Sequence, residues 1–300
     1  MHLYTMLVVI MASLHCYNIN QVINYIDSTE NYVSPYELQK LSNPKQISSG
    51  TDHNCVIDDN GVVCWGNNNI GQCDPPRLDS PTLISSAWNR TCAVNNNDEV
   101  ICWGYDYRDK SKPHSTSNII ALSTSQYHTC IIEQNGVVCW GSNDVSQSDP
   151  PVLHNPRAIT TGAGHSCALD LSGVVCWGAA IQSKVPSLKN PVSIAAGDYY
   201  TCAIDDSGLV CWGSSITTPV IQNPKHVFAG GEEICVIDSL NTAFCWDKNA
   251  NPSQTMPVLS NPKTISLGSF HACALDDSGV VCWGSNDYEQ TVLPGASPIY

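Results

Sequence analysis

Cysteines are the residues in this sequence with the most evident capacity for chemistry. Fourteen of the 16 cysteines form seven local pairs, spaced nine residues apart in five cases and ten in two. Spacing this regular is typical of a disulfide framework or of a metal array. The pairs are Cys55/Cys64, Cys92/Cys102, Cys130/Cys139, Cys167/Cys176, Cys202/Cys211, Cys235/Cys245 and Cys273/Cys282.

Metal binding is the weaker interpretation. In four units a histidine stands two residues before the first cysteine, so each of these units offers one imidazole and two thiols. Structural zinc takes four ligands and usually a closely spaced Cys-x2–4-Cys clip, which is absent. We therefore predict one disulfide per unit, with buried free thiols as the alternative, and neither metal nor cofactor. The histidines are His53, His128, His165 and His271.

The cysteine pairs lie inside a repeated string that predicts β-hairpins. The string reads HNCVIDDNGVVCWG from His53, and seven copies of it, with changes, occur along the chain. Its Val, Ile and Trp content is typical of strands, and an acidic turn ending in Gly is typical of a hairpin. A two-residue loop at Asp59 and Asn60 would place Cys55 opposite Cys64, in a non-hydrogen-bonded pair. In the two ten-spaced units we place the extra residue in the turn.

Repeats of this size predict an all-β, seven-bladed β-propeller. The first cysteines follow each other at steps of 33 to 38 residues, enough for three or four short antiparallel strands per unit. One unit buries too little surface to be stable, so the units must pack into a ring. We assign residues 17–42 to a lead-in that could supply a closing strand, and 43–300 to one domain. The blades begin near residues 43, 81, 118, 155, 190, 223 and 261.

The repeated string, with its His, acidic turn, Gly, Val and Trp-Gly, resembles the regulator of chromosome condensation repeat. The resemblance covers about residues 43–300 and is nearest to the compact variant of the bacterial β-lactamase inhibitory protein II. It implies a propeller that binds other macromolecules. The hairpin cysteines depart from that pattern and indicate a secreted branch of the family.

The first residues and the cysteine usage both predict an extracytoplasmic protein. Leu3 to Leu14 is an apolar run too short to span a bilayer, so we interpret residues 1–16 as a signal peptide. Disulfides also require an oxidising compartment. Cys73 has no partner in the repeats; it could be free, pair with Cys16, or link two chains.

Composition excludes several classes of function. The formal net charge is −14, which disfavours nucleic acid and anionic lipid as partners. We identify no membrane span. We also identify no nucleophile elbow and no phosphate-binding loop, so we predict that the protein is not an enzyme. We expect a monomer.

Positions that recur in every unit are interpreted as structural. The Trp of each unit is assigned to packing, and the repeated His to a hydrogen bond with a loop backbone group. The tryptophans are Trp65, Trp103, Trp140, Trp177, Trp212, Trp246 and Trp283.

The loop before each first cysteine varies between units, which favours recognition. The resemblance to the inhibitory protein assigns partner contacts to the aromatic residues of this loop. The alternative is that these rings only plug the central channel. Asn89 also begins a glycosylation sequon. The candidate residues are Asp52, Trp88, Asn89, Tyr127, Asp198, Tyr199, Glu232 and Phe270.

From these observations we predict a secreted binding module that recognises a protein through one aromatic-lined face. An enzyme inhibitor is one specific version. Two alternatives stay open: a guanine-nucleotide exchange regulator of a small GTPase, and a carbohydrate-binding surface protein.

Overall fold

The computed structural model describes residues 40–105, 116–214 and 216–295. The predicted signal peptide, Cys16 and nearly all of the predicted lead-in lie outside these residues. Within them, no helix is long and apolar enough to cross a membrane.

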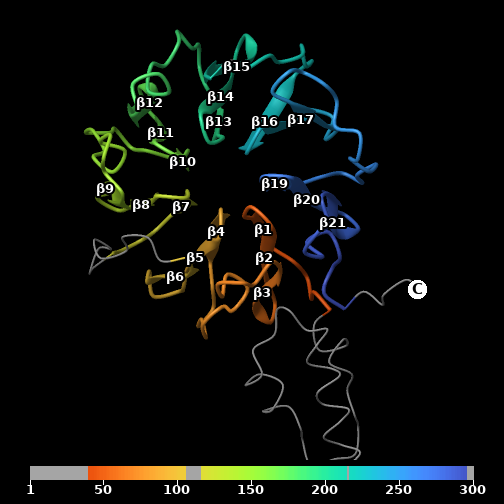
Figure 1. Ribbon diagram of the computed structural model, residues 1–300. Coiled ribbons are helices and arrows are strands. Elements are labelled where there is room, and N and C mark those ends of the chain that lie inside the picture. Colours follow the sequence, from red (N-terminus) through yellow and green to blue (C-terminus); the bar gives the residue numbers. More distant parts are fainter. Residues whose placement is uncertain (1–39, 106–115, 215, 296–300) are drawn as a thin grey trace, which may run out of the picture.

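Seven three-stranded antiparallel sheets surround a central opening (Figure 1). Each sheet is built from three consecutive strands, so the predicted all-β, seven-bladed propeller is confirmed. We number the blades 1 to 7 along the chain.

The first strand of each blade lies nearest the opening and the third lies outermost (Figure 1). The strands of blades 1 to 4 are β1 (Gln46–Ser49), β2 (His53–Asp58), β3 (Gly61–Gly66), β4 (Leu83–Ala87), β5 (Arg90–Val94), β6 (Val100–Gly104), β7 (Ala121–Thr124), β8 (His128–Glu133), β9 (Gly136–Gly141), β10 (Ala158–Thr161), β11 (His165–Asp170) and β12 (Gly173–Gly178). Those of blades 5 to 7 are β13 (Ser193–Ala196), β14 (Tyr200–Asp205), β15 (Gly208–Gly213), β16 (Pro224–Gly230), β17 (Glu233–Asp238), β18 (Ala243–Asp247), β19 (Thr264–Leu267), β20 (His271–Asp276) and β21 (Gly279–Gly284).

All seven predicted disulfides are present, each joining the second and third strands of one blade. Cys55 pairs with Cys64 across β2 and β3, with Cα atoms 4.1 Å apart, the close spacing of a non-hydrogen-bonded pair. In blade 2 the extra residue lies in the turn, where Asp98 adopts a positive φ of 60°. The bridges are Cys55–Cys64, Cys92–Cys102, Cys130–Cys139, Cys167–Cys176, Cys202–Cys211, Cys235–Cys245 and Cys273–Cys282.

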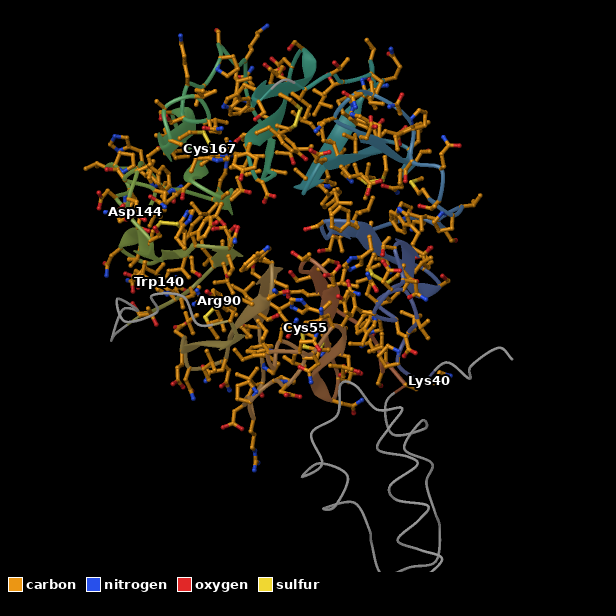
Figure 2. All side chains as sticks on the ribbon, in the orientation of Figure 1. Lys40, Cys55, Arg90, Trp140, Asp144 and Cys167 are labelled. Atoms are coloured by element: carbon orange, nitrogen blue, oxygen red, sulfur yellow. A yellow bond between two sulfur atoms is a disulfide. The ribbon has the colours of Figure 1, made fainter. Side chains whose placement is uncertain are left out.

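The two cysteines of a bridge differ in burial because they lie on different strands. The first, on the middle strand, is 0% exposed in all seven blades, and Figure 2 shows the sulfur atoms inside the blades at Cys55 and Cys167. The second lies on the outermost strand, where Cys64 and Cys245 are still buried but the other five are only half-buried. The alternative of buried free thiols is therefore wrong: all fourteen cysteines are bridged, and five are not fully buried. These five are Cys102, Cys139, Cys176, Cys211 and Cys282.

The acidic turns hold the chain where it enters each blade. In blade 4, the Asp170 carboxylate accepts hydrogen bonds from the backbone N–H groups of Ser172, at 2.7 Å, and His154, at 2.8 Å. Burial would raise the pKa of Asp170, but these hydrogen bonds outweigh it and leave the pKa lowered. The acid therefore fixes the turn and the incoming segment together.

Serine and threonine side chains join the inner strands around the channel. An inner strand has a free edge whose N–H groups need acceptors. Ser123 Oγ of blade 3 accepts from the Thr161 N–H of blade 4 at 3.0 Å, and Ser266 Oγ accepts from Ser49 N–H at 2.8 Å. Blades 5 and 6 depart from this pattern, because Ala195 and Phe228 occupy the corresponding position opposite the first cysteine.

The repeated histidines bridge neighbouring blades. Each is at most 1% exposed, and each Nε2 contacts a side chain of the next blade. The structural role is as predicted, but the Nε2 partner is not the expected loop backbone group. The sequence did not show this because the partner lies 36 or more residues away. The pairs are His53–Thr91 (2.8 Å), His128–Ser166 (2.7 Å), His165–Thr201 (2.8 Å) and His271–Asn54 (2.8 Å).

The repeated tryptophans form a second bridge, in the opposite direction. In blades 1, 2, 4 and 5 the indole N–H donates to the carbonyl of a glutamine in the preceding blade's outer loop. The pairs are Trp65–Gln290 (3.0 Å), Trp103–Gln72 (3.0 Å), Trp177–Gln147 (2.9 Å) and Trp212–Gln182 (2.9 Å). The Nε1 atoms of Trp246 and Trp283 are buried with no hydrogen-bond partner among the described residues.

The ring closes between blades 7 and 1 through side chains. The Gln290 backbone carbonyl accepts from Trp65 Nε1 and from Asn54 Nδ2, while His271 contacts Asn54 Oδ1. Among the described residues, neither end of the chain adds a strand to the other end's blade. The closing strand predicted for residues 17–42 lies outside the described residues, apart from residues 40–42.

Cys73 lies outside the seven disulfides and is only 2% exposed. Its thiol donates to the Asn67 carbonyl, with Sγ and O 3.3 Å apart. Burial this deep keeps the sulfur out of reach of a second chain, which disfavours the intermolecular link that we considered.

Candidate partner-binding face

The loops between the first and second strands of all blades meet on one face of the ring. There they surround a cavity of about 110 Å³, which we call the channel mouth, lined by residues from all seven blades. The central opening persists when side chains are drawn (Figure 2). The variable loops of the sequence are thus neighbours around a single mouth.

One residue of each loop, two before the bridging His or its equivalent, forms an inner ring around the mouth. We call these the mouth positions, and all but Ala163 line the cavity. Thr51 N–H donates to the Trp88 carbonyl at 2.7 Å, and Ala163 N–H donates to the Asp198 carbonyl at 2.9 Å, so adjacent loops support each other. The mouth positions are Thr51, Trp88, Gln126, Ala163, Asp198, Gly231 and Ser269.

The following residue of each loop forms an outer ring, which we call the rim positions. The rim aromatics are well exposed: 36% for Tyr127, 61% for Tyr199 and 71% for Phe270. Their backbones are held, because each carbonyl accepts an N–H from its own blade's outer loop at 2.8 to 2.9 Å. The rim positions are Asp52, Asn89, Tyr127, Gly164, Tyr199, Glu232 and Phe270.

The eight candidate residues therefore lie on one face but in two rings. Trp88 and Asp198 occupy mouth positions, and the other six occupy rim positions. The rings of Tyr127, Tyr199 and Phe270 do not line the mouth, so the plugging alternative applies to Trp88 alone.

Sequence reasoning missed Tyr105, which extends the aromatic surface. Its ring packs edge-on against Trp88, with centroids 5.6 Å apart and planes at 83°, and it is 41% exposed. The only signal was its place directly after a Trp-Gly pair, where other blades carry small or polar residues.

Carboxylates on this face repel each other. Burial, and then the charge of Asp287, raises the pKa of Asp52; burial, and then the charge of Glu232, raises the pKa of Asp198. Glu232 also forms an ion pair with Lys248. The face therefore carries more negative charge than its neighbouring cations neutralise.

Glu233 adds a further acid beside the rim. It lies directly opposite Asp247 in the hairpin of blade 6, where four other blades pair His with Gly. Burial, and then the Asp247 charge, raises the pKa of Glu233 despite a hydrogen bond with Ser253.

At the hairpin-turn ends of the sheets, away from the mouth, the acidic side chains are paired with lysines. Here lysines pair with the acids of the turns, as in Lys45–Asp59 at 2.8 Å and Lys263–Asp277 at 3.2 Å. Such exposed pairs contribute little to stability, but they do neutralise the local charge.

Asn89, the sequon residue, is half-buried at the rim. Its Oδ1 lies 3.5 Å from the Gln72 Nε2 donor, and its carbonyl accepts the Tyr105 N–H at 2.8 Å. A glycan at this position would stand beside Trp88 and Tyr105.

The family model of the Regulator of chromosome condensation (RCC1) repeat matches residues 45–72, 119–147 and 263–290, in blades 1, 3 and 7. Three of the seven blades of this β-propeller thus carry RCC1 repeats. No curated protein matches its sequence.

Two similar solved structures are plant receptor ectodomains. The CRINKLY WD40 ectodomain of the Arabidopsis thaliana receptor kinase ACR4 is 24% identical, with a TM-score of 0.68 over 84% of this chain and 100% of that one. The entire ectodomain of the Physcomitrella patens receptor kinase CR4 is 23% identical, with a TM-score of 0.67 over 82% of this chain and 74% of that one. At this identity the similarity establishes the fold alone.

Proposed function

We propose that this propeller is a secreted binding module that recognises a protein partner through the face around the channel mouth. The observation that supports this most strongly is the set of exposed rim aromatics, Tyr127, Tyr199 and Phe270, whose backbones are fixed by hydrogen bonds. Rigid aromatic side chains surrounded by polar groups are typical hot spots of protein interfaces, because they lose little entropy on binding.

The disulfides support an extracellular setting. Seven bridges in one small ring require an oxidising compartment to form and persist. This disfavours the exchange-factor alternative, which would act on a GTPase in the reducing cytosol or nucleus. No specific contact favours the carbohydrate-binding alternative.

Binding without turnover fits the chemistry of the four bridging histidines. All four are buried in the blade junctions, and burial lowers the pKa of His53 and His128 to about 3 and that of His165 and His271 to about 4. They are neutral and inaccessible at physiological pH, so they cannot serve a bound substrate as general acids. Inhibition of a partner enzyme by steric cover is one form that this function could take.

Affinity capture with two matched variants tests the proposal. The face variant carries Trp88→Ala, Tyr127→Ala, Tyr199→Ala and Phe270→Ala. The control carries Leu171→Ala and Leu240→Ala, at exposed hairpin turns on the other side of the ring. Captured extracellular proteins are identified, purified and titrated against all three forms.

We expect the native protein and the control to bind one purified partner equally, and the face variant to bind at least about 100-fold more weakly, since hot spots are worth about 2 kcal/mol or more each. Equal binding by the face variant would disprove recognition through this face.

A further inference from the structure

The channel mouth combines one aromatic ring with one carboxylate. Among the mouth positions that line the cavity, Trp88 is the aromatic residue and Asp198 the charged one, and the remainder are Thr51, Gln126, Gly231 and Ser269. Their strands, β4 and β13, lie on opposite sides of the central opening (Figure 1). A group entering the mouth would therefore meet Trp88 on one side and Asp198 on the other.

The Asp198 carboxylate has no hydrogen-bond or ion-pair partner among the described residues, and the residue is exposed at the mouth, where the charge of Glu232 acts on it. The cation in this neighbourhood, Lys248, pairs with Glu232. An unpaired carboxylate beside a second acid attracts a positive charge.

We propose that the partner inserts one basic side chain, a lysine or an arginine, into the channel mouth between Trp88 and Asp198. This inference rests on the proposed function and names the chemistry of the group recognised. A guanidinium or ammonium group would stack on the indole and form a charge-assisted hydrogen bond with the carboxylate.

The size of the mouth suits such a group. The mouth has a volume of about 110 Å³ and shares lining residues such as Ser49 and Ser86 with a cavity of about 390 Å³ along the inner strands, so it has room for one cationic head group on a thin aliphatic stem. With that side chain in the mouth, the remainder of the partner would rest on the rim aromatics.

Charge selects a cation over other occupants. An anion would be repelled by Asp198, Glu232 and Asp52, and by the net charge of −14. A neutral apolar group would bury the Asp198 carboxylate without compensation. A basic side chain relieves the repulsion between Asp198 and Glu232.

The probe is a capped tripeptide, acetyl-Gly-Arg-Gly-amide, compared with the same peptide containing citrulline, which has nearly the shape of arginine but no charge. Binding is followed by the indole N–H signals of the folded, disulfide-intact protein in two-dimensional NMR. The variants are Asp198→Asn, Trp88→Leu and a control, Asp206→Asn, whose carboxylate pairs with Lys189 at a hairpin turn.

We expect the arginine peptide to bind the native protein and the Asp206→Asn control roughly ten-fold more tightly than the citrulline peptide. Asp198→Asn should remove this preference, and Trp88→Leu should weaken binding of the arginine peptide. Equal affinity of the two peptides, or no binding of either, overturns the inference.

The captured partner separates this inference from the proposed function. A partner that is lost by the four-alanine face variant but unaffected by Asp198→Asn would leave the binding face standing and refute insertion of a cation. A partner indifferent to both variants would refute the proposed function itself.

Discussion

Blades 3 and 4 are joined by polar side chains as well as by a small apolar cluster, whereas blades 6 and 7 are joined mainly by apolar packing. Between blades 3 and 4, His128 contacts Ser166, Trp177 donates to the Gln147 carbonyl, and Ser123 accepts the Thr161 N–H. The corresponding residues that blade 6 presents to blade 7 are Glu233 and Phe228, and Trp283 Nε1 has no hydrogen-bond partner among the described residues.

Apolar contacts take the place of these hydrogen bonds at the later junction. Nine buried residues of blades 6 and 7 form one cluster, and Phe228, Met256 and Leu259 pack against it. The comparison shows that each junction must bury side chains while leaving few polar groups without a hydrogen-bond partner. Two different sets of side chains can meet this requirement.

Acidification should have the largest effect on stability, and it acts on the junctions that contain a buried histidine. Burial is the main cause of the low histidine pKa values, about 3 for His53 and His128 and about 4 for His165 and His271. In the unfolded chain each histidine binds a proton below about pH 6.5, while the native protein does not. The free energy of unfolding should therefore fall from about pH 6.5 downward, by about 1.4 kcal/mol per pH unit for each histidine.

Denaturant unfolding of the disulfide-intact protein between pH 7.5 and 4.5 measures this slope. Asp52, Asp198 and Glu233, whose pKa values are raised, act in the opposite direction and reduce it. His128→Gln should lower the slope by one proton. A stability that does not change over this range would contradict the buried, neutral state of the histidines.

Replacing one bridging histidine should have the next largest effect on the free energy of unfolding. His128→Ala removes a fully buried ring and deprives Ser125 and Ser166 of a partner, so we expect a loss of about 2–4 kcal/mol in the free energy of unfolding. The control is His226→Ala on the exposed part of β16, where we expect almost no change. Unfolding at pH 7.5, where both histidines are largely neutral, measures the difference. Similar losses of unfolding free energy in the two variants would contradict the bridging role of His128.

The indole N–H groups should show the smallest contrast. Trp177→Phe and Trp283→Phe remove similar volume, but only the Trp177 N–H has a carbonyl partner, at 2.9 Å. We expect Trp177→Phe to cost about 1 kcal/mol more. If Trp283→Phe is the more harmful of the two, its indole N–H has a role that the junction does not reveal.

Local features of this fold could be predicted from the sequence. The pairing of Cys55 with Cys64 follows from symmetry about Asp59 and Asn60, because hairpin register depends on residues close in the chain. The turn insertion beside Asp98 followed in the same way, from one extra residue between two cysteines.

Features that depend on packing between blades were harder to read. The partners of His53 and Trp65 lie in other blades, 38 and 225 residues away, so no spacing rule points to them. Within the loops, Trp88 and Tyr127 differ by one position relative to the bridging residue. That shift places one at the mouth and the other at the rim, although both are aromatic residues of the same loop.

Among the described residues, no strand is exchanged between the first and last blades, and this has a consequence for the order of the blades. Leu41 and Leu293, near the two ends of the described domain, pack against the same cluster between blades 7 and 1. Each blade is a continuous segment of chain, so the ring has no obligatory starting point. Circular permutation at any blade connection would preserve every sheet, and duplication or loss of a whole blade would require only a small change in the angle between neighbours.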